Sequence, residues 1–216
     1  MPNLRLLIGD DHTLFRHGLA KILEQRPDWT IVAQVGDGRE AVEKAIELLP
    51  DVAILDVGMP LLNGIDAAQQ IRRRAASVRV LMLSMHADEG YVTRALQAGA
   101  SGYLLKDSAS EDLIKGVESV AAGQSFFSPA IARLMLDDYV RRVAGHQVHD
   151  RFETLSERER EIFQLVAEGR TNKEVAELLG ISPATVETHR AHILQKLDIH
   201  NTAELVLYAV RRGVIA

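Results

Sequence analysis

The first 124 residues alternate between two kinds of segment, and this alternation constrains the fold more than any other feature of the 216-residue chain. Short apolar runs rich in β-branched residues predict five strands, at Leu4–Gly9, Thr30–Val35, Val52–Asp56, Val78–Ser84 and Ser101–Leu105. Amphipathic stretches between and after these runs predict five helices, near residues 13–26, 38–49, 64–75, 88–98 and 110–122. Strands that alternate with helices indicate an α/β fold with a doubly wound parallel sheet of five strands.

The pattern changes after Gly123, where the alternation ends. Residues 129–144 predict one further helix, and the polar, aperiodic residues 145–150 predict a linker. From residue 151 onward every segment has helical spacing. We therefore expect an α/β domain over residues 1–124, a linker containing a helix over 125–150, and a small all-α domain over 151–216.

Helix-start signals divide the all-α domain into four short helices. A capping box pairs the N-cap side chain with a glutamate three residues later, and a proline favours the first helical turn. The expected starts are the capping boxes Ser156/Glu159 and Thr171/Glu174, the pair Ser182–Pro183, and Thr202.

Chemically functional side chains stand where the strands of the first domain end. They are Asp10 and Asp11 after the first strand, Asp56 at the end of the third, Ser84 at the end of the fourth, and Lys106 after the fifth. In a doubly wound sheet, ligands bind outside the carboxyl ends of the strands, where the strand order reverses. With the flavodoxin-like order 2-1-3-4-5, strands one and three are neighbours at that point, so we expect the three carboxylates to converge.

Three clustered carboxylates repel one another, and they therefore favour a shared proton or a bound cation. Because the donors are oxygen atoms, a hard ion such as Mg²⁺ suits them. A metal ion beside a lysine and a hydroxyl is an arrangement for phosphoryl transfer, in which an aspartate can act as nucleophile. The alternative is that polar residues cap strand ends because loops are solvated, which explains any one of the five residues better than it explains the set.

These residues resemble the receiver domain of two-component response regulators. The resemblance covers residues 4–122 and rests on Asp10–Asp11, the stretch DVGMPLLNG at 56–64, Ser84, and GYLLKD at 102–107. It implies that Asp56 accepts a phosphoryl group from the phosphohistidine of a sensor histidine kinase. It further implies a Mg²⁺ site formed by Asp11, Asp56 and the backbone carbonyl of Gly58, with Asp10 assisting. In receivers the counterparts of Ser84 and Lys106 contact the phosphoryl oxygens, and that of Tyr103 changes position with Ser84.

Two positions depart from the commonest receiver pattern. Asp107 follows Lys106 where many receivers have a proline, and Ser84 stands where threonine is commoner. Ser84 keeps the hydroxyl group, and neither departure removes a group that phosphorylation needs.

The second and third helices of the all-α domain, joined by the tight turn Gly180–Ser182, have the layout of a helix-turn-helix motif. On a helical wheel of residues 183–197, the apolar face carries Val186, Ile193, Leu194 and Leu197. The opposite face carries the small or hydrogen-bonding residues Ala184, Thr188, Ala191, His192 and Gln195, with Thr185 and Glu187 at its margins. Such a face suits contact with base edges, but an ordinary amphipathic helix in a bundle would have the same apolar face. Charge does not decide between the two, because residues 151–216 carry nine basic and ten acidic residues rather than a basic excess.

Residues 155–197, LSEREREIFQLVAEGRTNKEVAELLGISPATVETHRAHILQKL, are similar to the LuxR-type helix-turn-helix domains of the NarL/FixJ response regulators. The resemblance implies that Glu187, Thr188 and Ala191 face the bases of double-stranded promoter DNA, with Ala184 nearby. It implies phosphate contacts for Thr171, Asn172, Lys173, Thr185, Arg190 and Lys196. Relatives have lysine at the position of Glu187, and a carboxylate there accepts from cytosine N4 instead of donating to guanine. The DNA sequence that the relatives bind therefore cannot be assigned to this protein.

The last helix, Thr202 to Arg212, has apolar residues around its whole circumference. A terminal helix can bury only one face against its own domain, so a second apolar face needs another partner. We expect a dimer contact through Val206 and Val210, since LuxR-type relatives use the corresponding helix in this way. The alternative is that the receiver covers this face at rest. Both arrangements occur if phosphorylation shifts the protein from a closed monomer or weak dimer, in which the receiver covers this face, to a homodimer, in which a second copy does.

Composition narrows the remaining possibilities. The chain has no cysteine, which excludes disulfides, thiolate catalysis and cysteine-ligated metals. Its net charge of −5 argues against binding nucleic acid or anionic membranes by bulk charge. Its N-terminal apolar run is too short for a signal peptide, and no apolar stretch reaches the ~18 residues of a membrane span, so we expect a cytoplasmic protein without a membrane partner.

The leading hypothesis is a phosphorylation-controlled, DNA-binding transcriptional regulator, not an enzyme beyond its own phosphoryl transfer and autodephosphorylation. A Mg²⁺-dependent aspartyl-phosphate phosphohydrolase would use similar groups, but it places its nucleophile after the first strand in an Asp-x-Asp pattern, which Asp10–Asp11 does not match. A third hypothesis makes the receiver a constitutive interaction module. The complete acidic set and Lys106 argue against it.

Overall fold

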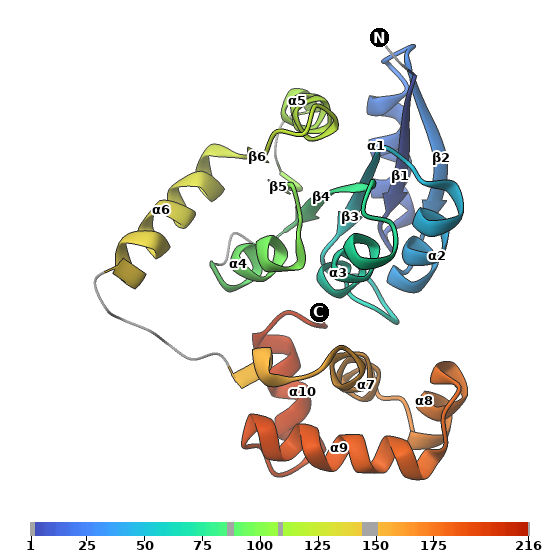
Figure 1. The fold of residues 1–216 in the computed structure, drawn as a ribbon, viewed down its shortest axis with the longest axis vertical. Helices are drawn as coiled ribbons and strands as arrows, with labels where there is room; N and C mark the ends of the chain where they lie inside the picture. The colour runs from blue at the N-terminus through green and yellow to red at the C-terminus, as the bar shows by residue number, and fades with distance from the viewer. Residues whose placement is uncertain (1–2, 86–88, 108–109, 144–150, 216) are drawn as a thin grey trace. The chain divides into compact units, whose positions relative to one another are not determined.

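The computed structural model describes residues 3–85, 89–107, 110–143 and 151–215, and the chain forms two compact units, Met1–His146 and Gln147–Ala216. The first unit alternates strands and helices, as Figure 1 shows. Its strands are β1 Leu4–Gly9, β2 Trp29–Val35, β3 Val52–Asp56, β4 Arg79–Ser84, β5 Gly102–Leu105 and β6 Phe126–Phe127. Its helices are α1 Thr13–Leu23, α2 Gly38–Leu48, α3 Gly64–Arg74, α4 Glu89–Ala98, α5 Ser110–Ala121 and α6 Pro129–Val143.

The strands form one parallel sheet in the order β2-β1-β3-β4-β5-β6. The expected order 2-1-3-4-5 is confirmed, but the expected count of five strands is wrong by one. Phe126 and Phe127 pair with Gly102 and Tyr103, which adds β6 at the edge of the sheet. A strand of two residues is too short to form the kind of apolar run by which the other five were predicted.

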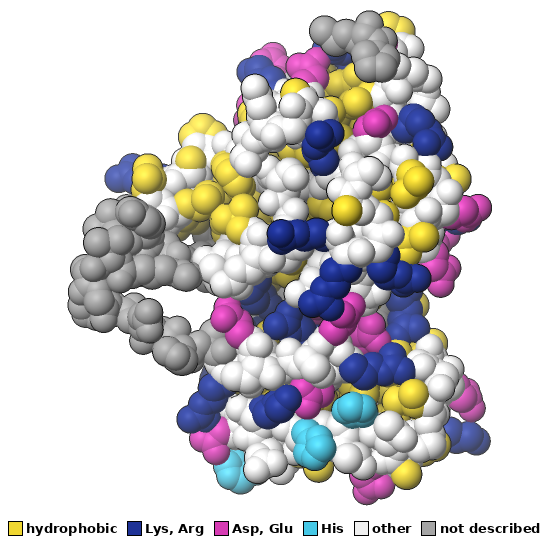
Figure 2. All heavy atoms as spheres, in the orientation of Figure 1, with side chains coloured by type: hydrophobic (Ala, Val, Ile, Leu, Met, Phe, Trp, Pro, Cys, Tyr) yellow, Lys and Arg dark blue, Asp and Glu magenta, His cyan; other side chains and the backbone are white. Residues whose placement is uncertain are grey.

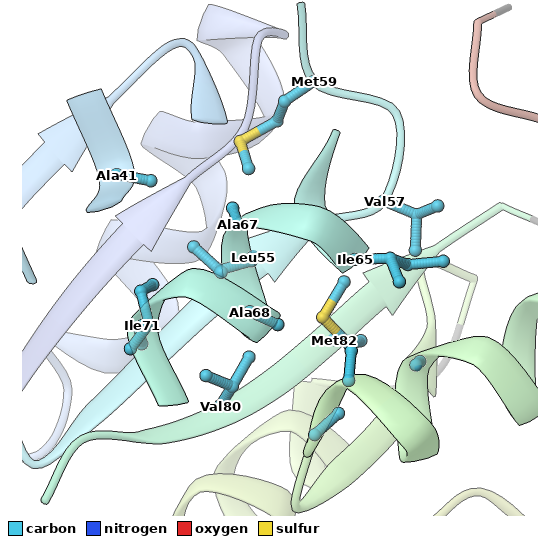
Figure 3. Close-up of a cluster of buried hydrophobic side chains, with 14 of the residues drawn as sticks. Ala41, Leu55, Val57, Met59, Ile65, Ala67, Ala68, Ile71, Val80 and Met82 are labelled. Carbon is cyan, nitrogen blue, oxygen red and sulfur yellow. The ribbon is translucent and has the colours of Figure 1, made fainter. Parts of the chain in front are cut away.

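Two hydrophobic layers cover the two faces of the sheet. On one face, α1 and α5 pack against strand residues such as Leu6 and Ile8. On the other face, α2, α3 and α4 pack against residues such as Leu55 and Met82, and Figure 3 shows these side chains interleaved with the small residues of α3. Because both faces are covered, the central strands are apolar along their length, as the sequence indicates for Val52–Leu55.

Helix α6 corresponds to the helix predicted for residues 129–144, within the segment 125–150 that we expected to be a linker containing a helix. The side chain of Ile131 is fully buried in the same cluster as Tyr91 and Tyr103, so the start of this helix packs on the core of the first unit. The expected linker residues 145–150, together with the predicted helix ends at residues 88 and 144, lie outside the described residues.

Two glycines hold the loop after β3 against its surroundings. A Cβ atom at Gly64 would lie 1.9 Å from the carbonyl oxygen of Asp56, and one at Gly38 would lie 1.8 Å from the carbonyl oxygen of Leu62. Real Cβ atoms do not approach backbone so closely, so both positions need glycine for steric reasons. The loop that follows Asp56 is therefore fixed by close backbone packing at its two flanks.

The second unit consists of helices: a 3₁₀ turn η1 Arg151–Thr154, then α7 Glu157–Ala167, α8 Asn172–Leu179, α9 Pro183–Leu197 and α10 Thr202–Arg211. Its core contains the buried rings of Phe152 and Phe163, whose centroids lie 5.3 Å apart, with the ring of Tyr208 6.0 Å from that of Phe163.

The predicted starts of three of these helices are confirmed. Both capping boxes form in full, and the Ser182 side chain accepts from the backbone N–H of Thr185. The predicted cap of the fourth helix is wrong. Asn201, not Thr202, has the extended backbone of an N-cap, and its side-chain oxygen accepts from the backbone N–H of Glu204 at 2.9 Å. Both residue types can cap a helix, so sequence alone does not separate the two neighbours.

Candidate functional site

The five predicted side chains at the strand ends lie together, and we call them the carboxylate site: Asp10, Asp11, Asp56, Ser84 and Lys106. Strands β1 and β3 are neighbours in the sheet, so Asp10 and Asp56 leave it side by side. Asp10, Asp56 and Ser84 are buried, whereas Asp11 is exposed at the rim. The geometry of the parallel sheet thus brings residues from four separate strand ends to one place.

The ammonium group of Lys106 lies between two of the carboxylates. Its Nζ is 2.7 Å from Asp10 Oδ2 and 2.8 Å from Asp56 Oδ2, and only 6% of its side chain is exposed. Attraction between opposite charges is much stronger at such buried positions than in bulk water. One ammonium therefore serves two buried carboxylates.

Burial, together with this sharing, shifts the pKa values of Asp56 and Lys106. Burial raises the pKa of Asp56 above its ordinary value of 3.8, and the negative charge of Asp10 acts in the same direction. The hydrogen bond from Lys106 opposes that shift without cancelling it. For Lys106, burial alone lowers the pKa, but its bonds to Asp10 and Asp56 outweigh burial and the pKa lies above 10.5. The site thus has more negative charge than its lysine balances.

The carboxylate oxygens are close enough to share a cation. Asp10, Asp11, His12 and Asp56 each offer a donor atom, and these atoms all lie within 4.8 Å of one another. The three carboxylates suit a hard ion such as Mg²⁺, because such ions prefer oxygen ligands. Gly58 is exposed beside them, and its backbone N–H donates to the Asp56 carboxylate.

Sequence reasoning missed His12, which belongs to the same cluster. Its Nδ1 lies 2.9 Å from Asp11 Oδ1, and its backbone N–H donates to Asp10 Oδ1 at 2.8 Å. The available signal was its position directly after the acidic pair. That signal is weak on its own, because a single histidine seldom marks a metal site.

The predicted switch pair, Ser84 and Tyr103, is brought together on β4 and β5. Tyr103 is fully buried, and its hydroxyl is hydrogen-bonded to that of Ser84. Burial raises the pKa of Tyr103 to about 12, so the phenol stays neutral at physiological pH. Ser84 therefore connects the carboxylate site with a neutral aromatic side chain inside the core.

The first turn of α1 also contacts the site, through two residues that the sequence analysis did not single out. The Nζ of Lys106 lies 4.7 Å from the centroid of the Phe15 ring. The guanidinium of Arg16 donates to the backbone carbonyl of Asp10. Helix α1 is thus attached directly to the end of β1.

In the second unit, α8 and α9 are joined by a turn in which Gly180 has a left-handed backbone. Val186, Ile193 and Leu197 are buried as predicted, whereas Leu194 is only half-buried. The predicted outer face is exposed throughout, at Ala184, Thr185, Glu187, Thr188, Ala191, His192 and Gln195. This face of α9 is therefore accessible in the described unit.

Five of the six predicted phosphate contacts divide into two groups. Thr171, Lys173 and Thr185 are exposed at helix starts. Arg190 and Asn172 lie together, because the Arg190 guanidinium donates to Asn172 Oδ1 at 2.6 Å and to Thr202 Oγ1 at 3.0 Å.

Lys196 is engaged within its own unit. Its Nζ lies 2.6 Å from Glu159 Oε2 and 3.3 Å from the carbonyl oxygen of Thr154. Glu159 is buried, so this ion pair fastens the end of α9 to the start of α7. The structure therefore gives Lys196 a role in holding α9 against α7, a role that the resemblance, which implies a phosphate contact for this residue, did not indicate.

Helix α10 has one buried and one exposed apolar face. Leu205 and Ala209 are buried, Val206 is half-buried, and Leu207 and Val210 are 57% and 49% exposed. The exposed apolar face predicted for Val206 and Val210 thus exists, and Leu207 is a further member of it.

Charge is mixed on the face of this unit that Figure 2 draws. Basic (dark blue) and acidic (magenta) side chains are interspersed there with histidines (cyan), and that face has no continuous basic area. None of the helices in the described part of the chain combines the length and the hydropathy needed to cross a membrane.

Two family models match the chain. The response regulator receiver domain matches residues 6–118, and the luxR family of bacterial regulatory proteins matches residues 153–209. Both resemblances inferred from the motifs are therefore confirmed.

Proteins of known name match over nearly the whole chain. The transcriptional regulatory protein MctR of Rhizobium johnstonii is 36% identical over 215 residues, which cover 100% of this chain and 97% of MctR. The oxygen regulatory protein NreC of Staphylococcus carnosus is also 36% identical over 215 residues, with 98% and 99% coverage.

Solved structures agree with these matches. The RcsB response regulator of Salmonella typhimurium has a TM-score of 0.60 at 27% identity, and the match covers 98% of this chain and 100% of RcsB. A LuxR-family two-component response regulator from Aurantimonas sp. has a TM-score of 0.61 at 34% identity, over 63% of this chain and 97% of that one. The chain therefore belongs to the response regulators that join a receiver domain to a LuxR-family DNA-binding domain, and it is a phosphorylation-controlled, DNA-binding transcriptional regulator.

Proposed function

We propose that Asp56 is the residue that becomes phosphorylated and that the reaction depends on Mg²⁺. The observation that carries this proposal is the position of Lys106, whose ammonium lies 2.7 Å from Asp10 and 2.8 Å from Asp56. An ammonium group beside one oxygen of an aspartate can also contact the oxygens of a phosphoryl group carried by that aspartate. Asp11 is more exposed, and Asp10 is committed to His12 as well as to Lys106.

In the proposed reaction a carboxylate oxygen of Asp56 attacks the phosphorus atom of a phosphohistidine on a sensor histidine kinase. The new P–O bond forms as the bond between phosphorus and the imidazole nitrogen breaks, and that nitrogen keeps the electron pair. Lys106 and the Ser84 hydroxyl stabilise the negative charge on the transferred oxygens. The raised pKa of Asp56 reflects a carboxylate that is poorly compensated, and such a carboxylate is a better nucleophile than a fully paired one.

The residues that would hold Mg²⁺ are Asp10, Asp11 and Asp56, with the backbone carbonyl of Gly58. When bound, the ion supplies positive charge that lowers repulsion between the carboxylates and the phosphoryl oxygens. The donor set fits this role because the carboxylate oxygens lie within 4.8 Å of one another.

The test is to treat the full chain with acetyl phosphate and Mg²⁺ and to locate the added phosphoryl group by mass spectrometry. We expect one label on Asp56, no label in Asp56→Asn, and no label when Mg²⁺ is chelated. The matched control is Asp107→Asn, which removes an exposed carboxylate next to Lys106 and should leave the label intact. A label on any other residue of the wild-type chain would contradict the assignment.

We infer that the exposed face of α9 enters the major groove of double-stranded promoter DNA. A solved complex of RcsB with DNA, at a TM-score of 0.59 and 26% identity, supports this use of the domain. Glu187, Thr188 and Ala191, with Ala184 nearby, would face bases, and Thr171, Asn172, Lys173, Thr185, Arg190 and Lys196 would lie near phosphates. The carboxylate of Glu187 would accept from cytosine N4, so a cytosine is expected within the bound half-site.

Selection of bound DNA by the phosphorylated protein, followed by Thr188→Ala, tests this inference. The substitution should relax base preference by ~1–3 kcal/mol at one position and leave non-specific binding unchanged. The exposed Gln195→Ala, farther along the same helix, is the control. Equal loss of affinity for every sequence would show that Thr188 does not read bases.

We further propose that phosphorylation promotes a homodimer through Val206 and Val210 on α10. The exposed Leu207 lies on the same apolar face, and such a face is stabilised when a second copy covers it. Sedimentation should give a larger mass after phosphorylation, and Val210→Asp should prevent the increase while keeping the label on Asp56. An unchanged mass after full phosphorylation would contradict this part of the proposal.

This function fits a regulator that works in the cytoplasm, where a sensor kinase can reach it and promoter DNA is accessible. Phosphoryl transfer to Asp56 and loss of that group are then the protein's only reactions. The alternative of a phosphohydrolase predicts turnover of small phosphate esters, which a release assay for inorganic phosphate would detect.

A further inference from the structure

The contact between Phe15 and Lys106 has no role in the function proposed so far. Phe15 lies in the first turn of α1, and the Lys106 Nζ is 4.7 Å from the centroid of its ring. An ammonium at this distance from an aromatic ring is attracted by the negative charge of the ring face, and the attraction grows when water is excluded. Only 6% of the Lys106 side chain is exposed, so this pair meets that condition.

The ring is held in a fixed place relative to the carboxylates. The Arg16 guanidinium donates to the backbone carbonyl of Asp10, and the backbone N–H of His12 donates to Asp10 Oδ1 at 2.8 Å. These bonds attach Arg16, which directly follows Phe15, and His12, three residues before Phe15, to Asp10. The Phe15 side chain is itself half-buried and packs against the hydrophobic core beneath α1, so it is not a freely moving surface side chain.

The other groups that attract Lys106 are the ones that a divalent cation would use. Its ion pairs in the described structure are with Asp10 and Asp56, and both belong to the cluster whose donor atoms lie within 4.8 Å of one another. Two cations that share the same oxygens repel each other, so a bound divalent ion weakens the hold of the carboxylates on the ammonium. The ring of Phe15 is unaffected by this competition because it is not a ligand of such an ion.

We propose that Phe15 is a positioning residue that keeps the ammonium of Lys106 at the carboxylate site when a divalent cation occupies the carboxylates. The inference rests on the proposed phosphorylation of Asp56, because Lys106 must then stay within reach of the incoming phosphoryl oxygens. Phe15 touches neither the phosphoryl group nor the metal and acts through Lys106 alone.

A second cation–π pair in the same unit shows what an ordinary surface contact looks like. The Arg26 guanidinium lies 5.2 Å from the centroid of the Trp29 ring, but 34% of its side chain is exposed and it pairs with Glu118 at 2.7 Å. Arg26 keeps that partner whatever happens at the carboxylate site. Lys106 differs because every ionic partner it has in the described residues is itself a candidate metal ligand.

The test compares Phe15→Leu, which keeps apolar volume but removes the ring, with Phe15→Tyr, which keeps the ring. The control is Leu14→Ala in the same helical turn, where the side chain is 88% exposed. The first measurement is NMR of lysine side chains in the full, metal-free chain, with Lys106 assigned from its absence in Lys106→Ala. A ring current should move the Lys106 Cε protons upfield in wild type, Phe15→Tyr and Leu14→Ala, and the shift should be lost in Phe15→Leu.

The second measurement is the rate of Asp56 labelling by acetyl phosphate at saturating Mg²⁺. We expect Phe15→Leu to label about 3- to 10-fold more slowly, with Phe15→Tyr and Leu14→Ala within about twofold of wild type. In the Lys106→Ala background, Phe15→Leu should have no further effect, because the residue acts only through the lysine.

Three results would overturn the proposal. The first is a Lys106 signal in wild type without an upfield shift. The second is a normal labelling rate in Phe15→Leu despite a lost shift. The third is an equal slowing by Phe15→Leu in both backgrounds, which would indicate a packing role. Failure of the wild-type chain to label at Asp56 would instead contradict the proposed function, while the NMR measurement would still decide whether the ring holds the lysine.

Discussion

Two lysines, one in each unit of this protein, pair with buried carboxylates. The pKa values of those carboxylates shift in opposite directions. In the receiver, Lys106 serves Asp10 and Asp56 together, at 2.7 and 2.8 Å. In the DNA-binding unit, Lys196 serves Glu159 alone, at 2.6 Å, and the Glu159 carboxylate also accepts the backbone N–H of Ser156 at 2.7 Å.

The pKa values follow the number of compensating groups. Burial raises the pKa of Asp56 above 3.8, and Lys106 cannot offset this because the charge of Asp10 adds to it. Burial also acts to raise the pKa of Glu159, but the hydrogen bonds from Lys196 and Ser156 outweigh it, so that pKa lies below 4.5. The difference teaches that the pKa of a buried carboxylate beside a lysine rises when acids outnumber cations and falls when the acid is fully satisfied. This contrast supports the proposal that Asp56 is the reactive acid and Glu159 a structural one.

The largest expected effect is on stability when Lys106 is replaced by methionine. Two buried carboxylates would then face each other without a cation, and breaking such a pair costs about 3 kcal/mol at neutral pH. Because Mg²⁺ can take over the neutralising role, millimolar Mg²⁺ should recover most of this loss. Urea unfolding with and without Mg²⁺ is the measurement. Equal destabilisation in both conditions would mean that the carboxylates do not bind the ion.

Lys196→Met should have a smaller effect, about 1–2 kcal/mol, because 39% of that side chain is exposed and water screens the pair. Mg²⁺ should not recover it, since Glu159 belongs to no cluster of possible metal ligands among the residues that the structure describes. The double variant Glu159→Gln with Lys196→Met should regain part of the loss, because it no longer buries an unpaired charge. Equal stabilisation of Lys196→Met and Lys106→Met by Mg²⁺ would contradict the claim that only the carboxylates beside Lys106 bind the ion.

The pH dependence should have opposite signs at the two acids, with effects of about 1 kcal/mol. Asp56 has a raised folded-state pKa, so its ionised form weakens the fold at neutral pH and Asp56→Asn should stabilise the protein there. That gain should shrink as the pH falls through the raised pKa, where Asp56 becomes protonated. Thermal unfolding from about pH 8 to about pH 3 gives the comparison.

Glu159 has a lowered folded-state pKa, so its ionised form strengthens the fold above the ordinary value of 4.5. Glu159→Gln should therefore destabilise the protein at neutral pH, and its penalty should disappear only as the pH falls through the lowered pKa. Stabilisation by both substitutions at neutral pH would show that Glu159 is no better compensated than Asp56.

The smallest expected effect separates the two lysines of the DNA-binding unit that we assigned to phosphates. Lys173 is exposed, so Lys173→Ala should weaken binding to all sequences and reduce the salt dependence of log K by about one. The ammonium of Lys196 is held by Glu159, so Lys196→Ala should change that slope less. A salt titration of DNA affinity measures both slopes, and equal reductions would show that Lys196 leaves Glu159 to reach a phosphate.

Sequence reasoning succeeded where periodicity and sheet geometry determine the outcome. Asp10, Asp56, Ser84 and Lys106 could be predicted as neighbours because the ends of parallel strands meet at one edge. It failed where the signal is short or depends on distant contacts. Strand β6 has only two residues, and the attachment of α6 depends on Ile131 reaching a core built from earlier segments.

The partner of Lys196 was missed for the same physical reason. Glu159 was recognised as part of a capping box, and that role is correct. Its second role depends on a contact across 37 residues, which neither helical spacing nor capping can reveal. The contact between Phe15 and Lys106 is also long-range and involves an aromatic residue that has no polar signature in the sequence.

The close packing of Gly64 against the backbone of Asp56 has a consequence for how this receiver tolerates variation. A methyl group at Gly64 would lie 1.9 Å from the Asp56 carbonyl oxygen, and one at Gly38 would lie 1.8 Å from that of Leu62. In a saturation library scored by transcriptional output, both glycines should therefore be as intolerant as Asp56 itself, although neither takes part in the chemistry. Gly58, whose Cβ would meet open space, should accept small side chains. A library of this kind separates positions that are invariant for steric reasons from positions that are invariant for chemical ones.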